Sequence, residues 1–439
     1  MKPSGASWLG DIPGNWDFPR IHSLFYEVND RYSPQEDGEW PLLSVSEYYG
    51  VAPRAEKIDE DAILVRAETL DGYKKCQPGD LVINIMLAWK NALGVAPCAG
   101  IVSPAYCVYR AREGVEPRYY HHLFRTKRYG DVFRTASTGI IDSRLRLYSD
   151  KFFAIHAPLP PPSEQRAIAA FLDDKCAAID SLADEAKASL AEYADWKRSI
   201  IFHAVTKGIP ADGGGRPSPA AAARGDARPP MKDSGVEWIG NIPAHWQVLP
   251  LKTQTDMLTP MRDRPEHLDG PIPWIRIEDF DGKYIAASKD GLGVSEETVR
   301  LMNLKVYPVG TVLCTSSCDL GKCAIVSTPL VSNQRFIGIV PKDGLLSDFL
   351  YYLMLSNAER LNMLSTGTIQ ANLSRVEFER LQVQIPPLAE QRAIATWLDE
   401  KCAAIEALVE EKKRLLDDLA SYKKSLIYET VTGKRRVLR

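Results

Sequence analysis

The sequence predicts an α+β protein with two globular domains, two long coiled-coil-like helices and an internal repeat of pseudo-two-fold symmetry. The first observation is the segment EQRAIA, which occurs at residues 164–169 and again at 390–395, each time at the start of a long helical run. The second is a lead-in of the form SGxxWxGxIPxxW, which occurs at residues 4–16 and again at 234–246. Because lead-in, body and helix recur in this order, tandem duplication of one unit is the simplest explanation.

Composition is that of an ordinary globular protein. Of the 439 residues 45% are hydrophobic and 25% are charged, so each half can bury a core of its own. The net charge of −3 does not indicate a nucleic-acid partner, although a local basic face can coexist with acidic surface elsewhere. The sequence has no apolar run of signal-peptide or membrane-spanning length, so we expect a cytoplasmic protein with no membrane partner and eight reduced cysteines.

The first domain is expected at residues 1–158, including the lead-in. Short β-rich runs such as 81–85 and 100–104 alternate with Gly, Pro and Asp, which is typical of a compact α+β body. The stretch 119–134 is predicted to be a helix and is the most basic part of this half, and a polar loop at 135–139 follows it.

The first long helix is expected within residues 159–208. Prolines at 160–162 suit a first helical turn but not a helix interior, Ser163 is a suitable N-cap, and Glu164 suits the positive end of the helix dipole. Nothing breaks the helix from Ser163 to Thr206, a length of ~66 Å at ~1.5 Å per residue. Apolar residues at spacings of three, four and seven predict a coiled-coil-like seam formed by Ile168, Leu172, Ile179, Leu182, Leu190, Tyr193, Trp196 and Ile200.

The second half repeats this order after a break. Residues 209–231 are rich in Gly, Pro and Ala and predict a flexible linker, the second domain is expected at 232–384, and the second helix at 385–434. Antiparallel pairing of the helices would hold the two domains at opposite ends of a rod longer than one ~34 Å turn of DNA. The second seam is expected at Ile394, Leu398, Ile405, Leu408, Leu416, Leu419 and Leu426.

Sequence signatures of catalysis are missing. The chain has no GxGxxG after a strand, no GxxxxGK[ST], no HExxH and no GxSxG, and it lacks the Asn/Asp-Pro-Pro-aromatic element of an amino-methylating DNA methyltransferase. Cys314, Cys318 and Cys323 lie close together without a nearby histidine, so a buried cluster is favoured over a zinc site. His121 and His122 are expected to have satisfied structural roles.

Several motifs carry a resemblance to a known family. The pattern PPxxEQxxI opens both long helices, at residues 160–168 and 386–394, and each copy follows a body of different sequence. Further similarities are GDLVIN at 79–84, AWKNALG at 88–94 and GIVSPAY at 100–106, with NQR at 333–335 and STG at 365–367 in the second half. In these features, which extend over nearly the whole chain, the sequence resembles the specificity subunit of type I restriction-modification systems.

The resemblance implies a non-catalytic subunit in which each body is a target-recognition domain for one half of a split double-stranded DNA sequence. The helices would fix the gap between the halves and dock two modification (methyltransferase) subunits, and restriction (translocase and endonuclease) subunits would join them. No cofactor is expected in this chain; S-adenosylmethionine, ATP and magnesium are expected on the partner subunits. Methylation of a base requires its extrusion into a catalytic pocket, which a partner would supply.

Candidate contact residues are polar and basic side chains on loops, because such groups read base edges and phosphates. For each of them alone, a solvated loop or turn is an equally good interpretation. The DNA-binding candidates are Lys90, Asn91, Arg110, Ser137, Thr138 and Arg144 in the first domain, and Ser316, Ser317, Lys322, Asn333, Gln334, Arg335, Thr368 and Gln370 in the second. The partner-binding candidates are Gln165, Arg166, Gln391 and Arg392, for which capping and bonds between helix and body are the alternative.

Two other function classes stay open at this point. A coiled-coil adaptor that binds only proteins would have no salt-dependent affinity for DNA. An enzyme acting alone would turn over DNA without other subunits. The recognised bases and the gap length do not follow from the sequence, since one chain offers no code that links loop residues to bases.

Overall fold

The computed structural model describes residues 1–56, 70–210, 230–260, 263–317, 320–364 and 373–437. Most of the predicted linker at 209–231 and the loop at 365–372, with the candidates Thr368 and Gln370, lie outside these residues. The chain divides into two compact units, which we call unit 1 (Met1–Lys187 with Lys413–Arg439) and unit 2 (Ala188–Lys412). The units therefore differ from the predicted domains, because each of them contains parts of both long helices.

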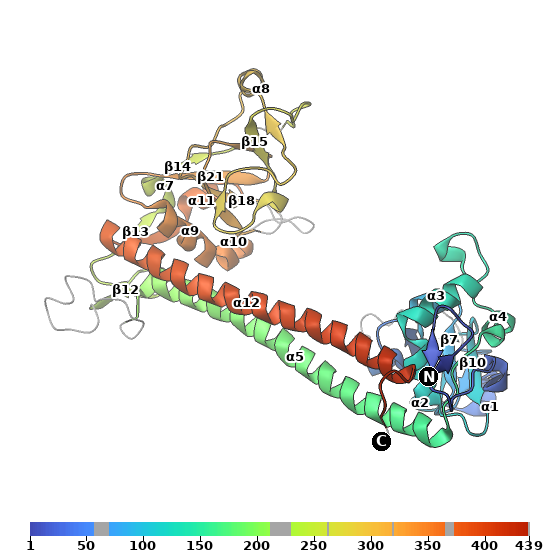
Figure 1. The fold of residues 1–439 in the computed structure, drawn as a ribbon. Coiled ribbons are helices and arrows are strands. Elements are labelled where there is room, and N and C mark those ends of the chain that lie inside the picture. Colours follow the sequence, from blue (N-terminus) through green and yellow to red (C-terminus); the bar gives the residue numbers. More distant parts are fainter. Residues whose placement is uncertain (57–69, 211–229, 261–262, 318–319, 365–372, 438–439) are drawn as a thin grey trace. The chain divides into compact units, whose positions relative to one another are not determined.

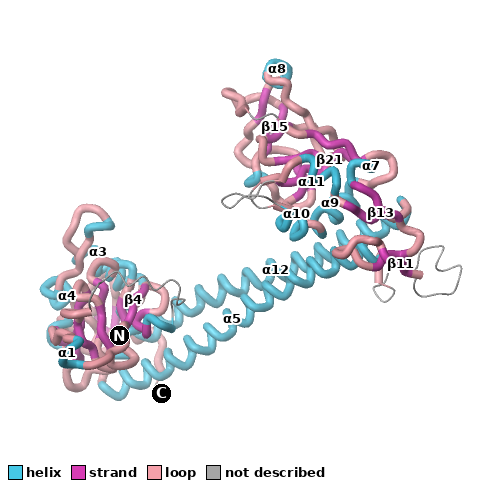
Figure 2. The backbone as a smooth tube through the Cα atoms, turned by 180° about the vertical axis from the view of Figure 1, so that it is seen from behind, coloured by secondary structure: helices cyan, strands magenta, loops and turns pink. Residues whose placement is uncertain are grey.

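The two long helices are α5 (Pro162–Lys207) and α12 (Leu388–Val431), of 46 and 44 residues. Both begin at or directly after the Pro-Pro pair, as expected from the tolerance of the first helical turn for proline. In unit 1 the start of α5 shares a core with the end of α12, and in unit 2 the end of α5 shares a core with the start of α12. The helices are therefore antiparallel within each unit. Figure 2 shows them in cyan, apart from the magenta strands of the bodies.

The helix seam differs from the prediction in the middle of both helices. Leu182, Trp196 and Leu408 were placed in the seam, but they are 51%, 50% and 38% exposed. The less exposed positions lie one residue later, at Ala183, Lys197 and Val409. The prediction was wrong there because it selected the most apolar side chains, whereas the contact face is set by helix geometry and accepts small and long-stemmed residues.

Unit 1 is built on a four-stranded antiparallel sheet whose strand order is β3-β10-β7-β8. Val108 in the centre of the sheet pairs with Val28 on one side and Val82 on the other. One face packs on the short helices α2 (Pro117–Phe124), α3 (Lys127–Ala136) and α4 (Ser149–Ala154), through an aromatic core that includes Tyr109, Phe124 and Phe152. The four strands are β3 (Phe25–Val28), β10 (Tyr106–Ala111), β7 (Leu81–Asn84) and β8 (Leu93–Val95).

Smaller strand pairs complete unit 1. They cover the other face of the sheet, where Val82 and Val108 pack with Leu43 and Val102 in a second core cluster. The lead-in forms a separate two-stranded sheet, with two residues in each strand. These pairs are β1 (Lys2–Pro3) with β2 (Asp11–Ile12), β4 (Leu43–Ser46) with β5 (Gly50–Pro53), and β6 (Lys74–Cys76) with β9 (Gly100–Val102).

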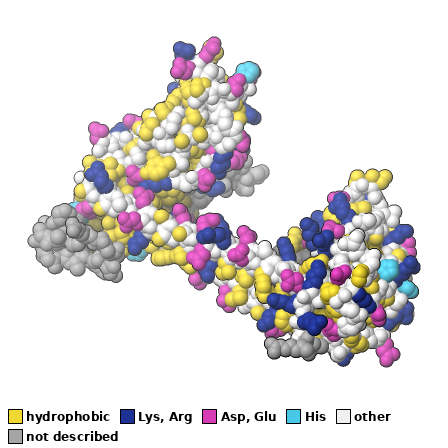
Figure 3. All heavy atoms as spheres, in the orientation of Figure 1, with side chains coloured by type: hydrophobic (Ala, Val, Ile, Leu, Met, Phe, Trp, Pro, Cys, Tyr) yellow, Lys and Arg dark blue, Asp and Glu magenta, His cyan; other side chains and the backbone are white. Residues whose placement is uncertain are grey.

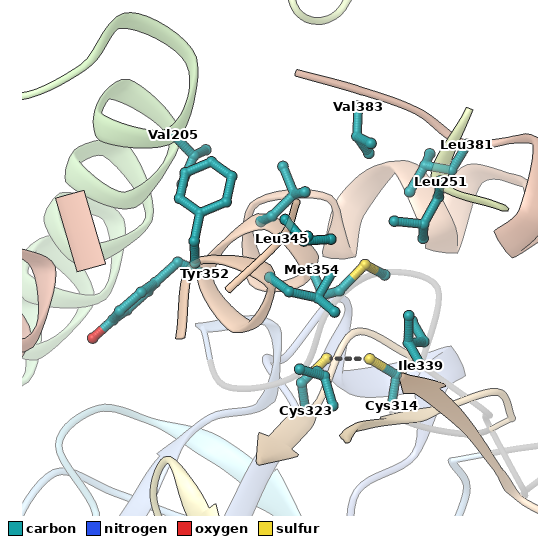
Figure 4. Packing of buried hydrophobic residues seen from close by; sticks show 14 of the residues in the cluster. Val205, Leu251, Cys314, Cys323, Ile339, Leu345, Tyr352, Met354, Leu381 and Val383 are labelled. Atoms are coloured by element: carbon teal, nitrogen blue, oxygen red, sulfur yellow. Dashed lines mark hydrogen bonds between the residues drawn. The ribbon is translucent and has the colours of Figure 1, made fainter. Parts of the chain in front are cut away.

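Unit 2 has a five-stranded sheet in the order β14-β21-β18-β19-β16, which is antiparallel except for the pairing of β16 with β19. One face packs on α9 (Ser347–Ser356), which brings Met354 close to the buried pair Cys314 and Cys323 (Figure 4). The five strands are β14 (Thr255–Leu258), β21 (Phe336–Pro341), β18 (Val312–Thr315), β19 (Cys323–Val326) and β16 (Tyr284–Ile285).

Unit 2 also carries a smaller sheet beside the five-stranded one, and its strand pairing resembles that of β4 with β5 and of Leu42 with Ile101 in unit 1. A three-stranded sheet with the order β17-β15-β20 encloses its own core of Trp274, Val294, Leu304 and Val331. Its strands are β15 (Ile272–Ile275), β17 (Gly293–Val294) and β20 (Val331–Ser332), accompanied by α8 (Glu296–Leu301). The rest of the unit comprises β11 (Met231–Asp233), β12 (Asn241–Pro243), β13 (Gln247–Pro250), α7 (Leu251–Gln254), α10 (Ala358–Leu364), α11 (Arg375–Arg380) and β22 (Gln382–Ile385).

Candidate nucleic-acid interface

The repeated Glu-Gln pair fixes each body to its own helix. Gln165 is fully buried: its Oε1 accepts a hydrogen bond from the backbone N–H of Glu116 (2.8 Å), and its Nε2 donates to the carbonyls of Gly114 (3.2 Å) and Pro160 (2.7 Å). Gln391 is also fully buried and makes the same three bonds, to Leu346 N–H (2.9 Å), Gly344 O (2.9 Å) and Pro386 O (2.8 Å).

The sequence interpretation names Gln165 and Gln391 as partner-binding candidates, with a bond between helix and body as the alternative. Both side chains are fully buried in this chain. The alternative weighed for them, a bond between helix and body, is what the structure has. Arg166 and Arg392, the next residues, are exposed, and partner contact remains a prediction for these two arginines.

The glutamates of the two pairs hold the lead-ins. The indole Nε1 of Trp16 donates to Oε2 of Glu164 at 3.0 Å, and that of Trp246 donates to Oε2 of Glu390 at 2.9 Å. Both indoles are fully buried. The duplicated sequence motifs thus form one duplicated joint, in which lead-in, body and helix start meet at the Glu-Gln pair.

Two candidates of the first domain have their polar atoms engaged inside unit 1. Asn91, in the left-handed region with φ 62°, donates through Nδ2 to the carbonyls of Phe124 (2.8 Å) and Thr126 (3.2 Å). Arg110 makes a two-pronged ion pair with the buried carboxylate of Asp80, at 2.9 and 2.8 Å. These bonds raise the pKa of Arg110 above its ordinary value. Both side chains are therefore bonded within unit 1. Their partners are about 30 residues away in the sequence, so the sequence alone did not indicate them.

The other four candidates of the first domain lie around one hairpin. Ser137, Thr138 and Arg144 belong to the segment between α3 and α4, which is closed by a bridge between Thr138 and Arg146. Thr138 and Arg144 are exposed, and the Ser137 hydroxyl donates to Phe133 O at 2.7 Å. Lys90 is exposed, with its ammonium 5.3 Å from the centre of the Trp89 ring.

In unit 2 the structure brings five candidates together around two cavities. Ser316, Ser317, Gln334 and Arg335 line a cavity of about 470 Å³, and Asn333, Gln334 and Arg335 line a neighbouring one of about 280 Å³. Gln334 and Arg335 are exposed and belong to both linings. The arrangement offers amide, hydroxyl and guanidinium groups at one place, which is the set of side chains that reads base edges and phosphates.

Three arginines at these cavities were missed by the sequence interpretation. Arg375 lines the larger cavity and pairs with Glu379 at 2.6 Å, while Arg264 and Arg276 line the smaller one. Arg276 also forms an ion pair with Asp290. The signal that could have found Arg276 is its place directly after the β-rich run 272–275, at the end of a strand.

Lys322 lies away from this group. It lines a third cavity of about 460 Å³ together with Lys283, Tyr352 and Asp399, at the contact between the body of unit 2 and the long helices. Lys283 bonds Asp348 and Asp399, both at 2.7 Å. Burial alone would lower the pKa of Lys283, but its two carboxylate partners outweigh burial and raise it.

The cysteines and histidines have structural surroundings. Cys314 and Cys323 face each other on adjacent strands with 2.8 Å between their sulfur atoms, whereas Cys318 lies outside the described residues. His121 accepts a hydrogen bond from Val95 N–H, and burial lowers its pKa to about 3, so it is neutral. Within the described ranges, no cluster of His, Cys, Asp and Glu has the geometry of a metal site, and no helix is both long and apolar enough to cross a membrane.

Known proteins resemble this chain in both sequence and structure. The family model described as the type I restriction modification DNA specificity domain matches residues 259–416. The specificity subunit of the type I restriction enzyme MjaIX of Methanocaldococcus jannaschii is 34% identical over 182 residues, which are 40% of this chain and 41% of that relative. The MjaVIII specificity subunit of the same organism is 23% identical over 97% of this chain and 94% of its own length.

Solved structures share the fold. A chain from a study of complex assembly and conformational transition of the type I R-M system superposes with a TM-score of 0.71 at 14% identity, over 97% of this chain and 100% of that one. The HsdS subunit from Thermoanaerobacter tengcongensis gives a TM-score of 0.58 at 16% identity, over 99% and 100%. These matches confirm the resemblance, first seen in the repeated PPxxEQxxI motif, to the DNA specificity subunits of type I restriction-modification systems, whose specificity domain matches residues 259–416 of this chain.

Proposed function

We propose that this chain reads a bipartite double-stranded DNA target, one half with each unit, and that it docks modification and restriction subunits. The observation that carries the proposal is the duplicated joint. Gln165 and Gln391 make the same three hydrogen bonds, so the chain sets two different bodies on two helices in the same way. A protein that recognises two different half-sites requires two different bodies that are attached to the helices in the same way.

The surfaces of the bodies support DNA as the ligand. Unit 2 gathers Asn333, Gln334 and Arg335 at the edge of two cavities, and unit 1 displays Thr138, Arg144 and Lys90 around its hairpin. Such groups bind phosphates and base edges. In this proposal the antiparallel helices set the gap between the half-sites, because 46 residues of helix extend for ~69 Å.

Chemistry is assigned to the partners in this proposal. Residues 259–416 match the DNA specificity domain of these systems, so in this proposal the methyltransferase subunits would bring S-adenosylmethionine, and the restriction subunits ATP and magnesium. We place the complex in the cytoplasm, where its DNA substrate lies. The exposed Arg166 and Arg392 at the helix starts are the partner contacts that remain in the proposal.

The test is genome-wide mapping of adenine methylation in cells that carry this chain and its modification subunit, compared with cells that lack the chain. We expect one new motif made of two half-sites separated by a fixed gap. Exchange of residues 1–158 for the same region of another member of the family should change one half-site only. A change in both halves, or a motif without a gap, would contradict the assignment of one half-site to each unit.

Binding of purified chain and partner to DNA separates this proposal from the adaptor interpretation. Phosphate contacts make affinity fall steeply with salt, at a slope close to the number of contacts. A complex that assembles but shows no salt-dependent affinity for DNA carrying the mapped motif would favour an adaptor that binds only proteins.

A further inference from the structure

The hairpin between α3 and α4 of unit 1 carries the most exposed isoleucine of the described residues at its tip. Ile140 is 100% exposed and its neighbour Ile141 is 54% exposed. Single apolar residues on a surface are ordinary, but two adjacent β-branched aliphatic side chains at the end of a projection are not. Figure 3 shows hydrophobic side chains at the extremity of this projection and Lys and Arg side chains on the surface around it.

The hairpin is a built structure that holds its tip in place. Thr138 and Arg146 exchange both backbone hydrogen bonds, at 2.9 and 3.0 Å, and the 3-10 helix η5 (Asp142–Arg144) closes the turn. Arg146 donates through Nη1 to the carbonyls of Ser143 (3.1 Å) and Leu145 (2.8 Å). Leu145 and Leu147 are buried and anchor the base of the hairpin.

Gly139 is required for this geometry. Its φ is +142°, and a Cβ at this position would lie 2.5 Å from the carbonyl oxygen of Arg144 on the returning strand. The chain therefore crosses itself closely just before Ile140. Because this close backbone contact fixes the base of the hairpin, the apolar tip loses little conformational entropy when it binds a ligand.

The surroundings of the tip are basic. Residues 127–146 contain five Lys or Arg and two Asp, in a chain whose net charge is −3. Arg144 is exposed beside the tip. Arg134 lies over the Trp89 ring at 4.9 Å and pairs with Asp142 of the hairpin at 2.6 Å. A DNA duplex has anionic phosphates on its outside and stacked, largely apolar bases inside. An apolar tip flanked by cationic side chains is complementary to both.

We propose that Ile140, with Ile141 behind it, is a wedge that enters between two base pairs of the half-site bound by unit 1. The inference rests on the proposed function and deepens it. Apolar side chains inserted at a base step unstack it and bend the duplex, and the arginines beside the wedge hold the phosphates on either side. Such a distortion lowers the work that the methyltransferase subunit must do to extrude its target base.

The sequence of the second half sharpens the proposal. Ser137-Thr138-Gly139 recurs as Ser365-Thr366-Gly367, but the next two residues are Thr368 and Ile369 where the first half has Ile140 and Ile141. The second loop lies outside the described residues, so the comparison concerns sequence only. Because a threonine replaces the leading isoleucine, we expect the distortion to be stronger in the half-site of unit 1.

The test uses the full chain with its modification subunit and duplexes that carry the mapped motif. The fluorescent adenine analogue 2-aminopurine, placed at successive positions, brightens where a neighbouring base unstacks. We expect wild-type complex to brighten one step in the half-site of unit 1. Ile140→Ala should abolish that signal and weaken binding about tenfold, because the apolar contact with the unstacked bases is lost. Ile140→Leu should retain both signal and affinity.

The control is Leu301→Ala, which removes a 79% exposed side chain from a helix whose first turn carries Glu296 and Glu297, and which should leave both readouts unchanged. An Ile140→Ala complex that keeps full brightening and affinity would overturn the wedge. So would loss of assembly with the modification subunit at unchanged DNA affinity, since the tip would then bind protein. Absence of DNA affinity in the wild-type complex would instead reject the proposed function, and the wedge with it.

Discussion

The joints of the two units are built alike in their backbone contacts and differently in their charges. Asp173 and Asp399 each lie eight residues after the buried glutamine of their helix. In unit 1, Asp173 accepts from His122 Nε2 at 2.8 Å and from Arg118 Nη1 at 3.1 Å. In unit 2, Asp399 accepts from the Tyr352 hydroxyl at 2.7 Å and from Lys283 Nζ at 2.7 and 2.9 Å.

One position has reversed its charge between the units. Arg118 and Asp348 each lie two residues after the residue whose N–H bonds the buried glutamine. Unit 2 thus has a carboxylate where unit 1 has a guanidinium, and Lys283 from the loop before β16 supplies the missing cation to Asp348. The comparison teaches that a duplicated unit keeps the side-chain bonds to backbone groups, while the charged partners around the aspartate of the helix diverge.

The largest effect is expected from replacing the glutamines. Gln165→Leu in unit 1 or Gln391→Leu in unit 2 leaves two carbonyls and one N–H without partners, and we expect a loss of at least ~3 kcal/mol of stability from either change. Amide hydrogen exchange measured separately for each unit is the readout. Arg166→Ala and Arg392→Ala, at the exposed next positions, should change stability by less than ~0.5 kcal/mol. Clearly unequal losses from the two glutamines would show that the joints are not equivalent.

Removal of the cation should be more harmful in unit 2. Lys283→Met leaves Asp348 and Asp399 facing each other without a counter-charge, and we expect unit 2 to lose ~1–2 kcal/mol, since both carboxylates are partly exposed. Arg118→Met should have a smaller effect, because the arginine side chain is 51% exposed and His122 still binds Asp173. Urea unfolding of the two variants, followed by amide hydrogen exchange in each unit, would measure both losses of stability. An equal loss in the two units would contradict this reading of the charge reversal.

The joints should also respond to opposite ends of the pH scale. The His122 hydrogen bond, aided by Arg118, lowers the pKa of Asp173 below its ordinary value of 3.8, so its contribution is present above that value and lost as pH falls through the lowered pKa. The carboxylates raise the pKa of Lys283 above 10.5, so its contribution is present below that value and lost as pH rises through the raised pKa. Exchange rates at pH 3 and pH 11, compared with Asp173→Asn and Lys283→Met, would separate the two. A variant that retains the full pH response would disprove its assignment.

The smallest effects are expected where the helices are bound by exposed ion pairs. Lys423 meets Asp180 at 2.6 Å in unit 1, and Lys197 meets Glu406 at 2.6 Å in unit 2. Lys423→Gln and Lys197→Gln should each cost ~0.3 kcal/mol and less at high salt. Thermal unfolding at low and high ionic strength would measure this, and a salt-insensitive loss would point to packing of the lysine stems instead.

Much of the fold could be predicted because it depends on local signals. Proline pairs, a suitable cap and an unbroken run were sufficient to place both long helices within a few residues of α5 and α12. The seam was misplaced at Leu182 and Trp196, because the prediction used apolar character alone, whereas helix geometry decides which face makes contact. Sequence order also does not show that the end of α12 shares a core with the first body, so the composition of unit 1 could not be derived from it.

The candidate site was less predictable because it depends on distant partners. Residue type identified Asn333, Gln334 and Arg335, which the fold brings to the cavities of unit 2. Residue type also selected Arg110, whose charge is matched by Asp80, the residue directly before the neighbouring strand β7. The isoleucines at 140 and 141 escaped attention, since a search for polar contacts passes over apolar side chains whose exposure only the folded hairpin reveals.

The end of α12 completes a body that precedes it by about 300 residues in the chain, and this sets an order of events during synthesis. The hydroxyl of Tyr119 donates to the carbonyl of Val431 at 2.8 Å across 312 residues, whereas the matching bond of unit 2, from Gln384 Nε2 to Val205 O, spans 179 residues. Unit 2 has all its residues once position 412 leaves the ribosome, but unit 1 waits for the end of α12. The body that emerges first is therefore finished last, and it is the one exposed to chaperones and proteases while translation proceeds.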